Sequence, residues 1–175
     1  VSDNWLSGQY MNVPLADLKA IVDNAIDKGY SVAWAADVSE GGFKWKEGFA
    51  VMPADKDEAD LEGTELSRWV KLSDAEKNRE KYDVKGPVKE IEVTQEMRQD
   101  MFDRQETTDD HGMVIVGKAT DQNGNEYYKV QNSWTDKQKY GGYFYVSMPY
   151  FLAKTMDIYV NKEAVPAAIR KRTGI

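Results

Sequence analysis

One imidazole and one amide stand at the two ends of a predicted β-hairpin. His111 is the only histidine of the chain, and it precedes the apolar run 113–116. Asn132 closes a second run rich in Tyr and Val, and Trp134 follows it. An imidazole that acts as a general base needs a group that fixes its tautomer and orientation, and an amide oxygen does this without adding charge. A neighbouring indole excludes water from such a hydrogen bond. The pair therefore suits proton transfer, although a lone histidine is more often a structural residue.

The turn between the two strands decides how closely this pair can approach. Residues 121–125 read Asp-Gln-Asn-Gly-Asn and predict a turn centred on Asn123-Gly124. In that register Asn132 lies opposite Ile115, and about four residues of strand, or ~13 Å, separate it from His111. A catalytic pair therefore requires a bulge that shifts the register, or a curved strand that folds the loop bearing His111 back.

A helix and a buried strand are predicted ahead of the hairpin. Pro14 suits the first turn of the helix, and Gly29 suits its end. Five apolar residues share one helix face, namely Leu15, Leu18, Val22, Ala25 and Ile26. Residues 30–38 predict a buried strand, and 41–52 predict a loop with aromatic side chains. Residues 1–13 predict an irregular or extended lead-in.

The stretch between this loop and His111 is polar and broken. Residues 55–62 are strongly acidic and predict a solvated loop, which a helix over 66–72 follows. Ser73 and Glu76 form a capping box for a charged helix that runs to about Tyr82. Gly86-Pro87 then breaks the chain, and residues 88–93 predict a half-exposed strand. Thr94 caps a short helix, in which Met97, Met101 and Phe102 lie on one side and face the core.

Strands dominate the chain after the hairpin. We expect a strand over 143–148, a turn or short helix over 148–154, and a last strand over 156–161. A terminal helix is predicted over 163–172, interrupted near Pro166. The predicted helices and the β-rich second half together indicate an α+β fold.

The size and composition of the chain exclude several classes of function. A chain of 175 residues suits one domain with a sizeable core. A net charge of −7 argues against a nucleic-acid partner, and no apolar stretch approaches the ~20 residues of a membrane span. The absence of cysteine excludes disulfides and thiolate metal sites. The sequence shows no phosphate-cradling glycine loop, and we expect no cofactor.

The two motifs resemble those of a known family. Asp110-His111-Gly112-Met113 followed by Asn132-Ser133-Trp134 resembles the His and Asn motifs of papain-like cysteine peptidases. The likeness is stronger to the bleomycin hydrolase and aminopeptidase C branch. It extends, in the same order, to residues 5–15, 31–38 and 141–147. The resemblance covers nearly the whole chain, as the C-terminal half of such an enzyme.

This resemblance implies a fold and roles for residues. Residues 1–175 would form one domain: helix, strand and insertion loops over 1–87, and the β-rich C-terminal lobe of a papain-like fold over 88–175. His111 would be the general base, Asn132 would orient it, and Trp134 would shield their hydrogen bond. Asp110 would favour the protonated imidazole or simply face solvent. In the aromatic loop, Trp45 and Phe49 would touch substrate or pack the loop.

The sequence departs from the family in two ways. Thr135 stands where the family usually has Gly after Trp134, and the chain holds no nucleophilic cysteine. The cysteine and the oxyanion-hole glutamine belong to the N-terminal half in this family. We therefore expect a processed or truncated piece that is inactive alone. Joined to that half, it would be a cysteine peptidase. The branch it resembles implies an aminopeptidase, and endopeptidase activity is the alternative because the family's long C-terminal arm is not evident.

Other interpretations stay open at the level of sequence. The chain could be a non-catalytic fragment or pseudopeptidase half that binds peptides or a protein partner. A metal site at Asp109, Asp110 and His111 is the weakest option, because one imidazole and adjacent carboxylates do not easily face one ion. The partners expected are a peptide substrate, the cysteine-bearing half and, by resemblance, further copies of the chain. The resemblance implies a cytoplasmic location, with secretion or a periplasmic location left open.

Overall fold

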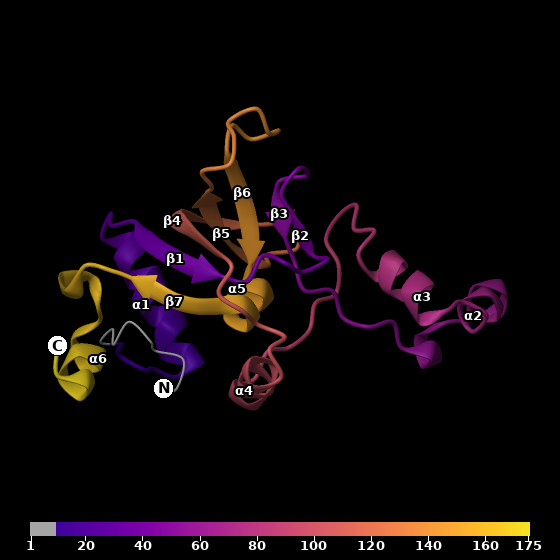
Figure 1. Cartoon of the computed structure of the whole chain (residues 1–175), viewed down its shortest axis with the longest axis horizontal. Coiled ribbons are helices and arrows are strands. Elements are labelled where there is room, and N and C mark those ends of the chain that lie inside the picture. The colour runs from indigo at the N-terminus through magenta and orange to yellow at the C-terminus, as the bar shows by residue number, and fades with distance from the viewer. Residues whose placement is uncertain (1–9) are drawn as a thin grey trace.

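The computed structural model describes residues 10–175, which are built around a twisted mixed sheet (Figure 1). The elements in chain order are α1 (Leu15–Asp27), β1 (Val32–Ala36), β2 (Phe43–Lys44), β3 (Phe49–Ala50), η1 (Glu58–Asp60), α2 (Gly63–Trp69), α3 (Asp74–Lys81), α4 (Gln95–Asp103), β4 (His111–Thr120), β5 (Glu126–Gln131), β6 (Tyr143–Ser147), α5 (Met148–Lys154), β7 (Thr155–Tyr159), η2 (Lys162–Ala164) and α6 (Ala167–Thr173). The strand order across the sheet is β2-β3-β6-β5-β4-β1-β7. Of the strand pairs in this sheet, β3 with β6 is parallel and the others are antiparallel.

The core lies between one face of the sheet and the helices α1 and α5. Strand β1 alternates in burial, so that Val32, Trp34 and Ala36 face inward. Both helices add buried side chains to the same cluster. Tyr150 and Phe151 of α5 are fully buried there. The sequence-based expectation of a core helix followed by a core strand is confirmed.

A longer loop and a bulge together change the predicted register of the β4–β5 hairpin. Thr120 pairs with Glu126, so residues 121–125 form the whole loop, and the Asp121 carboxylate accepts the backbone N–H groups of residues 123 and 125. The register then shifts between Ile115 and Gly117. Gln131 pairs with Val114, which brings Asn132 two residues closer to His111 than a turn at Asn123-Gly124 would allow. The prediction that Asn132 lies opposite Ile115 was therefore wrong.

Two other element predictions need correction. The predicted loop 41–52 contains the short β2–β3 hairpin. The predicted strand 88–93 is reduced to one isolated bridge, between Pro53 and Glu90. The Glu90 carboxylate accepts the Met52 N–H at 2.7 Å and the Ser147 hydroxyl at 2.5 Å. The Glu90 side chain thus accepts a hydrogen bond from a backbone N–H that a longer strand pairing would have used.

Helix starts follow their predicted caps. The capping box is present, with Glu76 accepting the Ser73 N–H at 2.8 Å, and Thr94 caps α4. Met101 packs on the core, but Met97 is 38% exposed, so the predicted apolar side of α4 is only partly buried. The predicted helix 66–72 is α2, a few residues earlier. The terminal helix is interrupted near Pro166, as expected, giving η2 and α6.

Helices α2 and α3 project away from the sheet (Figure 1). Trp69 is the buried residue of these two helices. The ammonium groups of Lys56 and Lys77 lie over its ring, 5.1 and 5.4 Å from the ring centroid. Surface ion pairs link the rest of this arm. The predicted acidic loop 55–62 leads into the arm and includes η1. Within residues 10–175, no helix has the length and apolar character needed to cross a membrane.

Candidate active site

The structure brings His111 and Asn132 into direct contact. His111 is the first residue of β4 and pairs with Ala36 of β1, while Asn132 follows the last residue of β5. The imidazole Nε2 lies 2.9 Å from the Asn132 Oδ1. Asn132 is buried, and its backbone N–H donates to the carbonyl of Gly142 at 3.0 Å. Strand pairing thus fixes both backbones, and the register set by the loop and the bulge brings the side chains together.

This contact selects a tautomer of the imidazole. An amide oxygen only accepts hydrogen bonds, so Nε2 carries the proton that Asn132 holds. Nδ1 is then the ring nitrogen available to a second reactant. The other end of the amide is unusual: Asn132 Nδ2 is buried and has no hydrogen-bond partner among the described residues. A buried donor in this state costs about 1–3 kcal/mol.

Trp134 covers the imidazole. The centroids of its ring and of the His111 ring are 4.9 Å apart, with an interplanar angle of 35°. The indole is 47% exposed, so its outer face meets solvent in this chain. Its inner side meets Phe43 and Trp45 edge-on, each at a centroid distance of 5.7 Å. Three sequence-predicted residues, His111, Asn132 and Trp134, therefore lie together.

Asp110 forms its hydrogen bonds with residues outside this cluster. Its carboxylate accepts the Val38 N–H at 3.2 Å and the Thr108 hydroxyl at 2.8 Å. These bonds tie the loop that precedes His111 to the end of β1. These contacts indicate that Asp110 holds this loop in place.

A buried charge cluster behind the loop was not predicted. Lys154 of α5 is fully buried and forms ion pairs with Asp37, at 3.4 Å, and with Glu40. The Asp37 carboxylate also accepts the Thr108 N–H at 3.3 Å. Burial acts to raise the pKa of Asp37, but hydrogen bonds from Ser39 and the charge of Lys154 outweigh it and lower the pKa. The only sequence signal was a lone lysine in the apolar run 148–154.

A hollow of about 450 Å³ adjoins Asn132 on the sheet face opposite the core. Its floor consists of small residues on neighbouring strands, Ala33, Ala35, Gly112 and Val114. Asp157 of β7 lies beside Ala35 and lines one side. Burial, and then the charge of Asp109, raise the pKa of Asp157.

Among residues 10–175, no three His, Cys, Asp or Glu side chains are grouped to hold a metal ion, so Asp109, Asp110 and His111 form no such group.

Comparison with known proteins supplies the family. The sequence pattern of the Peptidase C1-like family matches residues 56–173, more than half of the chain. The chain belongs to this family. It is a papain-like cysteine peptidase family member with an α+β fold, as the motifs predicted.

The relatives are aminopeptidases. Aminopeptidase C of Lactobacillus delbrueckii subsp. lactis is 24% identical over 163 residues, which are 93% of this chain and 30% of that protein. Aminopeptidase W of the same organism is 41% identical over 59 residues, 34% of this chain and 14% of its own length. The crystal structure of PepW from Lactobacillus rhamnosis matches 91% of this chain and 29% of its own, with a TM-score of 0.58 and 19% identity, which supports the fold. This Peptidase C1-like chain thus spans less than a third of these proteins.

Proposed function

We propose that this chain supplies the general base and its orienting group to a cysteine aminopeptidase. The observation that carries the proposal is the 2.9 Å contact between His111 Nε2 and Asn132 Oδ1, in a member of a peptidase family. The names of the relatives favour an aminopeptidase. The chain holds no cysteine, so the nucleophile must come from another segment, and we expect this chain alone to be inactive.

The proposed chemistry is acyl transfer through a thiolate. Nδ1 of His111 takes the thiol proton, which leaves a thiolate beside an imidazolium. The thiolate attacks the carbonyl carbon of the peptide bond. The imidazolium returns the proton to the departing amine, and an acyl-enzyme thioester remains. Water, deprotonated by the same imidazole, then hydrolyses the thioester and restores the thiol.

The surrounding residues keep the imidazole ready for both transfers. Asn132 holds the Nε2 proton, so that Nδ1 presents its lone pair in one direction. Trp134 limits the access of water to this hydrogen bond. The Asp110 and Asp37 carboxylates hold the loop before His111 against β1. In this proposal the substrate peptide lies across the hollow beside Asn132.

A binding function is the second candidate, and the absence of cysteine favours it. In this case the same hollow would hold a peptide or protein segment without cleavage. His111 and Asn132 would then remain as a structural pair. This function predicts measurable peptide affinity for the chain alone.

Mass spectrometry of the natural gene product separates the two candidates. The product is purified, treated with an epoxide inhibitor that alkylates active-site thiols, and measured intact under denaturing conditions. A longer or companion polypeptide that gains one adduct supports the peptidase. The control carries His111→Ala, and its adduct should form far more slowly. An unlabelled product that contains only this ~20 kDa chain refutes the peptidase proposal and leaves peptide binding to be tested.

A further inference from the structure

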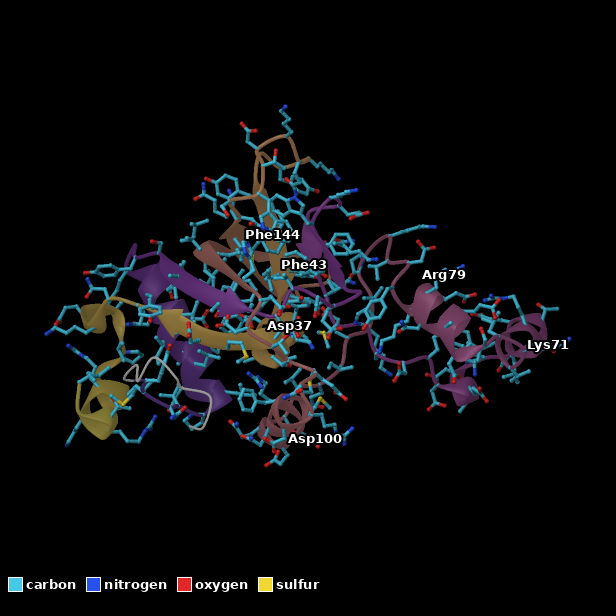
Figure 2. The ribbon with its side chains drawn as sticks, in the orientation of Figure 1. Asp37, Phe43, Lys71, Arg79, Asp100 and Phe144 are labelled. Atoms are coloured by element: carbon cyan, nitrogen blue, oxygen red, sulfur yellow. The ribbon has the colours of Figure 1, made fainter. Side chains whose placement is uncertain are left out.

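The aromatic residues of the β2–β3 hairpin lie directly beneath Trp134. Phe43 and Trp45 each meet its ring edge-on, and both also meet Phe144 edge-on, at centroid distances of 5.3 and 5.5 Å. Figure 2 shows Phe43 and Phe144 close together where the hairpin meets the sheet. Phe144 is fully buried in the core. Trp134 therefore rests on side chains that are themselves supported by the core.

The same hairpin also binds the loop that follows Trp134. Gln138 of this loop donates through Nε2 to the carbonyl of Trp45 at 3.1 Å. The carbonyl of Gly48 accepts the Tyr145 N–H at 3.0 Å. A Cβ atom at Gly48 would lie 2.2 Å from the Tyr140 ring, so the two segments are in close contact. The hairpin thus contacts the residues on both sides of residues 135–137.

The contacts beneath Trp134 affect how well the His111–Asn132 hydrogen bond is shielded from water. Trp134 is 47% exposed, so burial alone does not hold its ring. A tryptophan that swings outward would leave the His111–Asn132 hydrogen bond open to water on that side. The two edge-on contacts oppose this movement, because such aromatic pairs are stabilising.

We propose that Trp45 is a positioning residue, which together with Phe43 holds Trp134 over the His111–Asn132 hydrogen bond. This inference rests on the proposed function only for its catalytic consequence. The ring contacts of Trp45 are with Trp134 and Phe144, so Trp45 acts on the imidazole through Trp134. Its role differs from substrate contact, the alternative that the sequence left open for this aromatic loop.

The single histidine makes the proposal measurable without catalysis. In the chain with ¹⁵N-labelled histidine, the Nε2–H proton belongs to one residue, and its exchange with water can be followed by NMR. Trp45→Ala should raise the exchange rate by about two- to tenfold, as the loss of one edge-on aromatic pair predicts. Trp45→Phe should recover most of the loss. Trp69→Phe, in the projecting arm, is the matched control and should leave the rate unchanged.

A second variant guards against misfolding. Gln138→Ala removes the hydrogen bond to the Trp45 carbonyl without touching the core, and should also raise the exchange rate, by less. An unchanged rate in both folded variants overturns the proposal, as does a Phe variant no better than Ala. In the complete peptidase, Trp45→Ala should lower kcat and leave KM nearly unchanged, whereas a raised KM with unchanged kcat indicates substrate contact and overturns it. If the complete protein hydrolyses no peptide, the proposed function fails, but the exchange rates still decide the role of Trp45.

Discussion

His111 and Asn132 meet at 2.9 Å at the open end of a hairpin whose register is set by the loop 121–125 and by one extra β4 residue between Ile115 and Gly117. A β-bulge of this kind shifts the register and re-aims side chains near the end of a strand. The orientation of the imidazole therefore depends on the amide of Asn132 and on strand pairing several residues away.

Removal of the amide should reduce turnover. Asn132→Ala in the complete peptidase leaves the imidazole without a partner for Nε2, so both tautomers and several ring orientations become accessible. We expect kcat to fall about ten- to a hundredfold, a part of what a general base contributes. Steady-state kinetics check this, with the neighbouring Ser133→Ala as the control. Equal kcat values for the two variants would contradict the assigned role.

Loss of the buried ammonium should destabilise the fold strongly. Lys154→Met leaves Asp37 buried and without its cationic partner. Breaking a buried ion pair from one side costs about 3–5 kcal/mol. Lys118→Met removes an exposed pair with Asp27 and should cost at most about 1 kcal/mol. Urea unfolding of both variants at neutral pH measures the difference, and similar midpoints would refute the prediction.

Asp37 should make the fold sensitive to acid. Its pKa is lower in the folded chain than in the unfolded chain, so its contribution to the free energy of unfolding is present above the unfolded value, about 4. The contribution is lost as the pH falls from there through the folded pKa. The drop in unfolding free energy across this window should be smaller in Asp37→Asn than in the wild type. Asp136→Asn, at an exposed loop position, should keep the wild-type slope.

Gly42 should tolerate no larger residue. A Cβ atom there would lie 1.9 Å from the carbonyl oxygen of Val51, which is backbone and cannot turn aside. Gly42→Ala should therefore force the β2–β3 hairpin to shift and cost about 1–3 kcal/mol. A Cβ atom at Gly86 would meet no atom of residues 10–175 within 4 Å, so Gly86→Ala is the control. Denaturant midpoints compare the two, and a stable Gly42→Ala chain would show that the hairpin is more adaptable than its contacts indicate.

Asp157 should favour positively charged peptides if the hollow holds substrate. Its carboxylate lines the side of a floor made of small residues, so a cationic group there would gain its main ionic partner. We expect Asp157→Asn to lower kcat/KM about tenfold for a peptide with a charged basic group at this position. A neutral peptide of equal length should lose little. Equal losses for both peptides would show that Asp157 acts on folding instead.

Much of the local structure was readable from short stretches of sequence. The Ser73 and Glu76 capping box and the Thr94 cap needed only neighbouring residues, and both helices begin where these caps predict. The strand predicted over 30–38 was equally local, but the structure buries only one of its two faces, with the pattern that alternates along β1. The alternating pattern of residues 88–93 predicted a strand, and this prediction was wrong. The Glu90 side chain turns inward and binds the Met52 N–H and the Ser147 hydroxyl.

The sequence by itself determined the helix caps, the apolar faces and the residue types of the candidate site, because each depends on residues close together in the chain. Only the tertiary structure decided the bulge in β4, the burial of Lys154 beside Asp37, and the place of Trp45 beneath Trp134. The bulge lies in the pairing of two neighbouring strands, whereas the other two features join segments that are far apart in sequence. Their geometry follows from how the sheet pairs and packs, and no short pattern encodes that.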